Sequence, residues 1–424
     1  MNCLDWIFFV LSLVKEMAAP LSSEFLITLN DPRVLWNENW LAVVLELAGA
    51  ILIYQVCKNA KMRQSESRFL VLAAMIATMC FEILPFFRAG YELWWYHPGF
   101  LNIIRARLPS YIISSFALTQ YVADCLTKDA KLPTLTRAFV TSIFSLLIIA
   151  PFVWMAPRLL LITYHFDDPV FKDRIFDIPA IQLLVLLLLS FHTSHLFYEN
   201  CDELSPHQKN TSNYILCALQ SGLVAAIYTT VEQYVLYMLF KLTMQLHTGT
   251  CLLVAGAMLA YLAKGEIEYF QLKTTSKSGF FQPLKNKAFW GLAAAFIFLI
   301  TLPLWMNSED IKSTGTRLEL GPCGITHAIS NTNPLDVTRR RFVCPEDTRL
   351  LNYDFHCVAQ NEMSQAVKDI RKTYTICGKS FVNYLQTVQI MAVYSVLCLL
   401  VFHSVMRFSF AFQVEKKTIP KIIE

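Results

Sequence analysis

This chain contains a series of long apolar runs bounded by charged residues or proline. A helix needs about 20 mainly apolar residues to cross a hydrocarbon core about 30 Å thick. The expected fold class is therefore an all-α polytopic membrane protein, with one small disulfide-bonded external domain between the last two transmembrane helices. The nine predicted spans are residues 40–57, 69–87, 108–126, 138–162, 177–198, 213–240, 249–264, 288–306 and 385–411.

The amino-acid composition also indicates that the chain lies in a membrane. Hydrophobic residues make up 55% of the 424 positions and charged residues only 16%, which leaves too little polar surface to cover a soluble globule of this size. The net charge is +4, and the basic residues are scattered between apolar runs. This pattern argues against a nucleic-acid partner, and the expected partner is the lipid bilayer.

The distribution of Lys and Arg between the short loops predicts the orientation of the chain. The first, third and seventh loops are basic, which places them in the cytosol, the N-terminus outside and the C-terminus in the cytosol. We expect the plasma membrane or another membrane of the secretory pathway. The second loop is an exception, because it is basic although predicted to be external. The residues that set the orientation are Lys58, Lys61, Arg63, Arg68, Lys128, Lys131, Arg137, Lys264, Lys273, Lys277, Lys285 and Lys287.

Four cysteines test this orientation independently of the charges. Cys323, Cys344, Cys357 and Cys377 all fall in the long polar stretch 307–384, which the loop charges place outside. An oxidising compartment pairs cysteines, so we predict two disulfides that stabilise a domain with a small core. Spacing alone leaves three pairings open.

The chain is thus expected to have five segments. Within the external domain we predict a helix near residues 364–371 and irregular structure elsewhere. The run Arg339–Arg341 is either a site for an acidic ligand or a solvated basic turn, and residues 307–384 are a candidate surface for an extracellular partner. The segments are an external N-terminus with a short interfacial apolar helix (1–39), eight transmembrane helices (40–306), the cystine-containing domain (307–384), the ninth transmembrane helix (385–411) and a cytosolic tail (412–424).

Ionisable side chains inside the predicted spans are candidates for function, because a charge in hydrocarbon costs at least about 2.5–3.5 kcal/mol. Glu46, Glu82 and Glu232 lie in three different spans, and Arg158 lies in the fourth. Carboxylates that converge on one cavity would bind a cation or serve proton-coupled transport. The alternative is structural pairing between helices, such as Glu232 with Arg158.

His192, His195 and Glu199 form the most metal-like string, because their spacing places them on one face of a helix. A metal centre needs further ligands from other helices, and the remaining histidines show no second cluster. The alternative is a pair of interfacial histidines at a helix end. The sequence identifies no cofactor and contains no common soluble catalytic motif, so we favour a protein that is not an enzyme.

These observations favour a transporter, channel or lipid translocator with Glu46, Glu82, Glu232 and Arg158 in its pathway and an unidentified small solute, ion or lipid as its substrate. The alternative is an orphan serpentine-like receptor or sensor, because the first seven spans have that layout. Further alternatives are an adhesion or assembly subunit that works through the external domain, and an intramembrane lipid enzyme that uses His403 or the histidines of the metal-like string.

Overall fold

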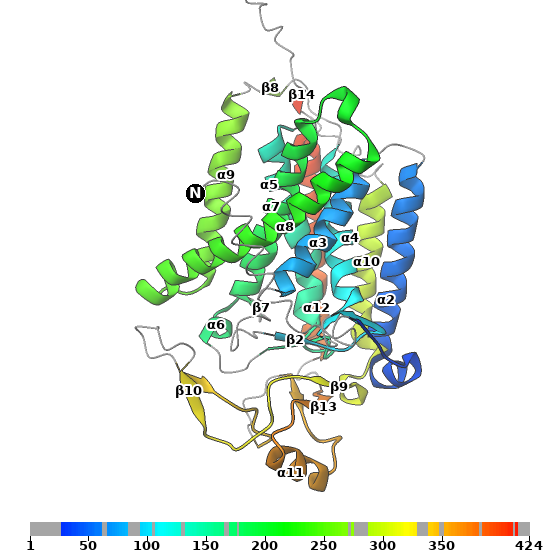
Figure 1. The fold of residues 1–424 in the computed structure, drawn as a ribbon, viewed down its shortest axis with the longest axis vertical. Helices are drawn as coiled ribbons and strands as arrows, with labels where there is room; N and C mark the ends of the chain where they lie inside the picture. The colour runs from blue at the N-terminus through cyan, green and yellow to red at the C-terminus, as the bar shows by residue number, and fades with distance from the viewer. Residues whose placement is uncertain are drawn as a thin grey trace, which may run out of the picture.

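The computed structural model of the chain describes residues 27–61, 66–83, 94–103, 107–128, 132–164, 169–175, 178–269, 273–274, 287–328, 338–346, 352–380, 384–409 and 412–413. Within these residues the molecule is mostly helical. Long helices stand side by side, and a small domain that contains strands covers one end of the bundle (Figure 1). The predicted interfacial helix at the N-terminus and most of the cytosolic tail lie outside the described residues.

Each predicted span falls on a long helix of the described chain. The helices are α2 (Pro32–Lys61), α3 (Ser67–Ile83), α4 (Ser110–Thr127), α5 (Thr134–Met155), α7 (Ala180–Asp202), α8 (Thr211–Leu236), α9 (Gly249–Tyr269), α10 (Lys287–Trp305) and α12 (Tyr384–Ser409).

Six helical segments in the described residues are long and apolar enough to cross a membrane, and α10 contributes a shorter apolar stretch, Trp290–Leu302. A mostly helical fold with several apolar spans is thereby confirmed. The six segments are Pro32–Lys58, Thr134–Met155, Ala180–Asp202, Thr211–Thr243, Gly249–Tyr269 and Leu385–Ser404.

Several helix boundaries differ from the predicted spans, and two of these differences have a clear physical cause. α2 begins at Pro32 and bends at Asn39, whose backbone is not helical and whose Nδ2 donates a hydrogen bond to the Leu159 carbonyl at 2.8 Å. α5 ends at Met155 because Pro157 cannot continue the helix, and a turn follows. Arg158 was predicted inside the fourth span, and this was wrong, since it lies in that turn.

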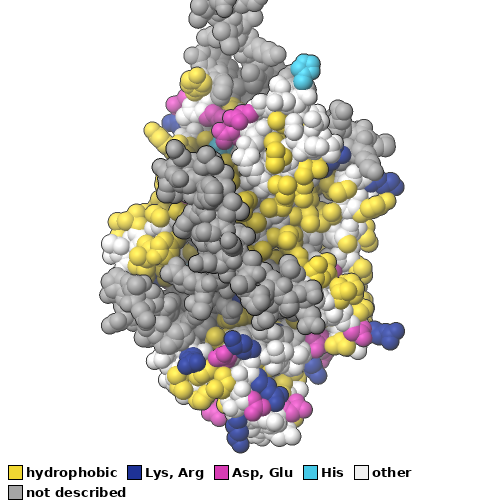
Figure 2. Space-filling view, viewed as in Figure 1, with side chains coloured by type: hydrophobic (Ala, Val, Ile, Leu, Met, Phe, Trp, Pro, Cys, Tyr) yellow, Lys and Arg dark blue, Asp and Glu magenta, His cyan; other side chains and the backbone are white. Residues whose placement is uncertain are grey.

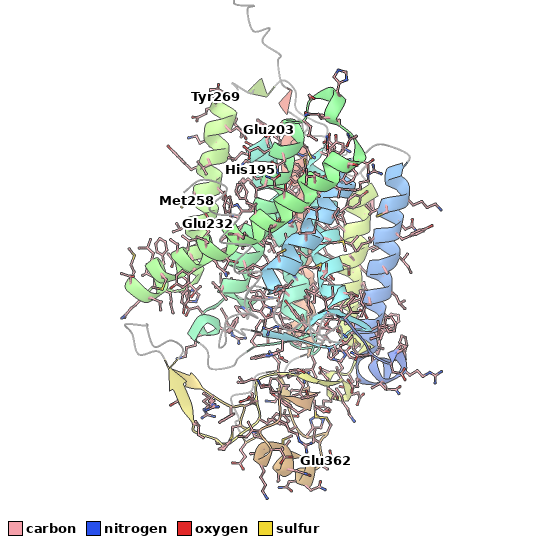
Figure 3. The ribbon with its side chains drawn as sticks, in the orientation of Figure 1. His195, Glu203, Glu232, Met258, Tyr269 and Glu362 are labelled. Atoms are coloured by element: carbon pink, nitrogen blue, oxygen red, sulfur yellow. A yellow bond between two sulfur atoms is a disulfide. The ribbon has the colours of Figure 1, made fainter. Side chains whose placement is uncertain are left out.

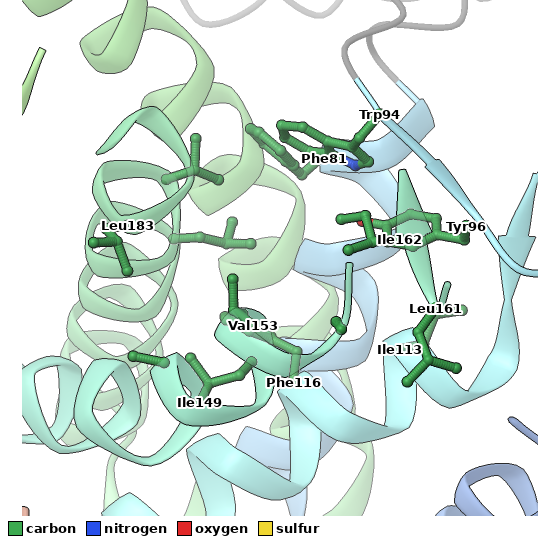
Figure 4. Packing of buried hydrophobic residues seen from close by; sticks show 14 of the residues in the cluster. Phe81, Trp94, Tyr96, Ile113, Phe116, Ile149, Val153, Leu161, Ile162 and Leu183 are labelled. Carbon is green, nitrogen blue, oxygen red and sulfur yellow. The ribbon is translucent and has the colours of Figure 1, made fainter. Parts of the chain in front are cut away.

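The centre of the bundle is α7, which packs against α3, α5, α8 and α9. Its apolar window is 78% buried, whereas the windows of α9 and α12 are only 22% buried. A helix that is apolar all round belongs in such a central position. Figure 4 shows Phe81 of α3, Phe116 of α4, Val153 of α5 and Leu183 of α7 converging in this core.

The outer helices leave large apolar side chains exposed. Leu47 of α2, Leu253 and Tyr261 of α9 and Val393 of α12 are all more than half exposed. Figure 2 shows hydrophobic side chains over the middle of one face and charged side chains gathered at the end that holds the small domain. A surface this apolar is unfavourable in water and suits contact with lipid.

A close approach between α3 and α8 depends on a glycine. A Cβ atom at Gly222 would lie 2.6 Å from the Ala73 carbonyl oxygen and 2.8 Å from the Ile76 Cβ. The backbones of the two helices can approach this closely only with a very small residue here, as is common between helices in membranes.

Short antiparallel strands lie at both ends of the bundle. At the end near the small domain, β2 (Trp94–Tyr96) pairs with β5 (Ile162–Tyr164), and β3 pairs with both β1 and β4. β8 (Lys273–Thr274) pairs with β14 (Phe412–Gln413) at the opposite end (Figure 1). Other short elements include β1 (Ile27–Leu29), β3 (Leu101–Ile103), β4 (Leu108–Pro109), α6 (Pro169–Lys172), β6 (Arg174–Ile175), β7 (Ile178–Pro179) and the π-helix Tyr237–Thr243 that follows α8.

The small domain between α10 and α12 is built on a three-stranded sheet. Its strand order is β12-β13-β9, with β13 in the centre. The expectation of irregular structure was therefore wrong, and the helix α11 begins before the predicted stretch 364–371. The elements are β9 (Lys312–Thr316), β10 (Thr326–Ala328), β11 (Thr338–Arg340), β12 (Tyr353–Asp354), α11 (Gln360–Lys368) and β13 (Thr373–Gly378).

Two disulfides in this domain confirm the prediction from the four cysteines. They join Cys323 to Cys344 and Cys357 to Cys377, so the pairing that the sequence left open is the consecutive one.

Candidate functional site

Glu46 of α2 accepts hydrogen bonds from a loop and a helix start at the end of the bundle that faces the small domain. Its carboxylate accepts from the backbone N–H groups of Phe100 at 2.5 Å and Leu101 at 3.0 Å, and from the Ser110 hydroxyl at 2.5 Å. A Cβ at Gly99 would lie 2.7 Å from the same carboxylate. These contacts hold the start of β3 and of α4 against α2, and they satisfy a carboxylate that is almost fully buried.

Glu82 of α3 has a comparable arrangement with β2. It accepts a hydrogen bond from the Tyr96 hydroxyl at 2.7 Å and from the Trp94 indole at 3.3 Å. The described contacts of Glu46 and Glu82 share no partner. The two carboxylates therefore anchor separate strands.

Glu232 of α8 has a different kind of partner. Its Oε2 lies 2.6 Å from Nε2 of His192 on α7, and the Glu232 side chain is 41% exposed. Arg158, which the sequence offered as a partner, instead donates to the Trp154 carbonyl at 2.7 Å and lies 4.0 Å above the Trp154 ring. Of the three predicted carboxylates, Glu232 alone pairs with an imidazole.

His192, His195 and Glu199 line one face of α7, and we call these three residues the α7 stripe. Nε2 of His195 lies 3.8 Å from Oε2 of Glu199, and its ring stacks on Phe191. At about 1.5 Å of rise per residue the stripe runs about 10 Å along the helix. In Figure 3, Glu232 and His195 lie at mid-height of the bundle, and Glu203 lies nearer the end opposite the small domain.

The described residues contain one group of three ligand-type side chains with their atoms close together, and it is Asp354, His356 and Cys377. Cys377 is part of a disulfide, so its sulfur is not a thiolate and this group is a poor metal site. The α7 stripe does not form such a group in the described structure. A metal bound by the α7 stripe stays a prediction without a converging ligand set.

Sequence reasoning missed a buried ion pair between α4 and α5. Nη2 of Arg137 lies 2.6 Å from Oδ1 of Asp124, whose side chain is 1% exposed. The Tyr198 hydroxyl of α7 donates to the same Asp124 oxygen at 2.6 Å, and the Arg137 guanidinium lies 4.1 Å above the Tyr198 ring. An aspartate inside the predicted span 108–126 was the signal that could have revealed this cluster.

A second buried polar cluster joins the small domain to the bundle. Nδ1 of His97 lies 2.7 Å from the Ser313 hydroxyl at the start of β9, and the Tyr111 hydroxyl of α4 donates to the His97 carbonyl at 2.9 Å. Burial and, to a smaller extent, the positive charge of Arg317 together lower the pKa of His97 to about 3. The imidazole is therefore neutral at physiological pH.

Acid is expected to loosen this junction. The unfolded chain binds a proton at His97 below about pH 6.5, whereas the folded protein resists it down to about pH 3. The contribution of His97 to stability is therefore complete above pH 6.5 and falls by up to about 1.4 kcal/mol per pH unit as the pH drops below that value.

Hydrogen exchange of β9 and β13 at pH 7.5 and pH 5 measures this effect. We expect lower protection factors at pH 5 than at pH 7.5 in the parent, after correction for the intrinsic pH dependence of amide exchange, and a smaller difference in His97→Gln, which cannot titrate. Equal differences in the two proteins would remove His97 as the cause.

Comparison with known proteins assigns the chain to a family but indicates no activity. Residues 13–407 match a family model described as a domain of unknown function, DUF7802. No curated protein and no solved structure matches the chain. Because the match covers most of the sequence, this chain belongs to the DUF7802 family.

Proposed function

We propose that this chain is a multi-pass membrane transporter for protons or another small cation, with the Glu232–His192 pair as its binding site. The observation that carries the proposal is the 2.6 Å contact between a partly exposed carboxylate and an imidazole, both on apolar helices. An ionisable pair at such a place is costly to maintain, and such pairs commonly mark an ion or proton pathway.

The topology that we propose has nine transmembrane helices, an external N-terminus and a cytosolic C-terminus, in the plasma membrane or a secretory-pathway membrane. Two features support it. The disulfide-bonded domain lies at one end of the bundle and the β8–β14 pair at the other (Figure 1). Disulfides persist in oxidising compartments, which favours the outside for the first of these ends.

The α7 stripe supplies one half of the proposed route. Two imidazoles, His192 and His195, are followed by the carboxylate of Glu199 in the direction of the proposed cytosolic end. His195 and Glu199 are 3.8 Å apart, so transfer between them requires a bridging water or a small rotation. Each group can accept a proton and release it, which is what a relay in a membrane requires.

In this proposal Glu46 and Glu82 anchor strands and do not bind the cation. Their oxygens are occupied by backbone, hydroxyl and indole donors of the strands that they anchor. A cation would have to displace those donors. We therefore restrict the proposed pathway to Glu232 and the α7 stripe.

The test is the substitution Glu232→Gln, which keeps the shape of the side chain and removes its charge. The purified protein is reconstituted in vesicles, and proton uptake under an imposed potassium diffusion potential is followed with a pH-sensitive dye. We expect uptake in the parent and a loss of at least about tenfold in the variant.

Glu268→Gln is the matched control, because Glu268 is exposed on α9 and pairs at the surface with Lys264. It should transport as the parent does. Absence of proton, sodium and potassium flux in the folded parent would overturn the proposal, and so would full activity in Glu232→Gln.

A further inference from the structure

The small domain contains a buried arginine without an acidic hydrogen-bond partner among the described contacts. Arg317 follows β9 and is 3% exposed. Its Nη1 donates to the carbonyls of Tyr374 at 2.9 Å and Gly315 at 3.3 Å, its Nη2 donates to the Ser313 hydroxyl, and its Nε is buried with no hydrogen-bond partner. All of these acceptors are neutral.

The surrounding charges compensate this guanidinium poorly. Burial lowers the pKa of Arg317, although the negative charge of Glu38 on α2 acts in the opposite direction. An oxygen of Glu38 instead accepts a hydrogen bond from the Thr314 N–H at 3.2 Å. A buried charge that is only partly compensated is unfavourable, so a further negative group beside Arg317 would stabilise the structure.

A small pocket lies beside this guanidinium. Arg317, Tyr353 and Tyr374 of the small domain line it together with Trp95 of β2 and Tyr164 of β5. Its volume is about 10 Å³, which is room for a single water-sized atom or ion. The pocket thus lies at the junction of the small domain with the bundle, and aromatic rings form much of its wall.

His97 adds a second nitrogen to the same cluster. The Ser313 hydroxyl accepts from Arg317 and can give its own proton to Nδ1 of His97, which leaves the imidazole proton on Nε2. Nε2 is also buried and has no hydrogen-bond partner among the residues that the structure describes. Two buried N–H groups that lack an acceptor therefore belong to one hydrogen-bonded cluster.

We propose that the pocket beside Arg317 binds one small monovalent anion of the chemistry of chloride. The anion neutralises the guanidinium and accepts the N–H of its Nε. Because residues from both the small domain and the β2–β5 pair line the pocket, the bound anion also fastens the domain to the bundle. The inference does not depend on the proposed transport, since Glu232 and the α7 stripe take no part in it.

The full-length protein in detergent tests this proposal by thermal unfolding in sodium chloride and in sodium gluconate at equal ionic strength. Gluconate is too large for the pocket. We expect the Tm of the parent to be about 3 °C higher in chloride, with a saturable dependence on its concentration. Arg317→Met should have the same Tm in both salts. Arg371→Gln is the control, because Arg371 is exposed and pairs with Asp369, and it should respond as the parent does.

Bromide provides a measurement that needs no variant. Crystals of the parent grown in sodium bromide should show an anomalous scattering peak beside Nε of Arg317. A peak there together with the chloride-dependent Tm supports the proposal. Equal Tm values of the parent in both salts, or a pocket without a bromide peak, would overturn it and leave a water molecule as the occupant.

Discussion

Replacing Arg137 with methionine is expected to lower the free energy of unfolding by about 3–5 kcal/mol. The substitution removes the positive partner of Asp124, which is 1% exposed and lies 2.6 Å from the guanidinium. The remaining donor, the Tyr198 hydroxyl, cannot balance a full negative charge in a buried site. Equilibrium unfolding in mixed detergent micelles, followed by tryptophan fluorescence, measures the change.

The double variant Arg137→Met with Asp124→Leu separates the loss of attraction from the exposure of an unpaired charge. We expect it to recover most of the stability, because a buried ion pair replaced by apolar side chains is often close to neutral. Lys264→Met is the control for removing a charge, since Lys264 pairs with Glu268 at the surface, and it should cost less than about 1 kcal/mol. An equal cost for Arg137→Met and Lys264→Met would show that the buried pair contributes little.

Removing the disulfide Cys357–Cys377 with paired alanine substitutions is expected to destabilise the small domain by about 3 kcal/mol. The disulfide closes a loop over a sequence separation of 20 residues, and opening it gives the unfolded chain more freedom. Cys377 lies in β13, the central strand of the sheet, so the whole domain should be affected. Protease protection of residues 312–378 as a function of temperature measures the loss.

Circular dichroism of the same variant provides the control, because the helices of the bundle should unfold at nearly the parent temperature. A reductant opens both disulfides, so it should destabilise the domain of the parent at least as much as the substitutions do. If protection of the domain were unchanged in both cases, its packing against the bundle, and not the disulfide, would hold it in place.

The helices could be predicted from sequence because apolar runs of spanning length have few other uses. The ends of the helices were harder to predict. Pro157 marks the end of α5, but a span drawn from hydropathy continues through Leu159 and Leu161, which are buried in the following turn. The strands of the small domain are two to six residues long and pair across large separations in the chain, as β9 does with β13. Such pairing leaves little local pattern.

The site was predictable only in part, for a related reason. Hydropathy identifies a carboxylate in an apolar run but does not reveal which groups satisfy it. Glu46 is satisfied by backbone N–H groups more than 50 positions away in sequence, and any residue type could supply those. Glu232 needs a side chain as its partner, and that partner, His192, was singled out for its spacing from His195 and not for a carboxylate on another helix.

The position of the small domain between α10 and α12 has a consequence for biosynthesis. The β2–β5 pair, which meets the small domain at the pocket beside Arg317, comes from residues 94–164. The ribosome therefore synthesises this pair well before the domain that covers it. In the topology that we propose, the β2–β5 pair faces the lumen uncovered until β9 and β13 emerge. Oxidation of the four cysteines and docking of the domain would then come late in maturation, and a luminal chaperone or oxidoreductase would meet the uncovered β2–β5 pair first.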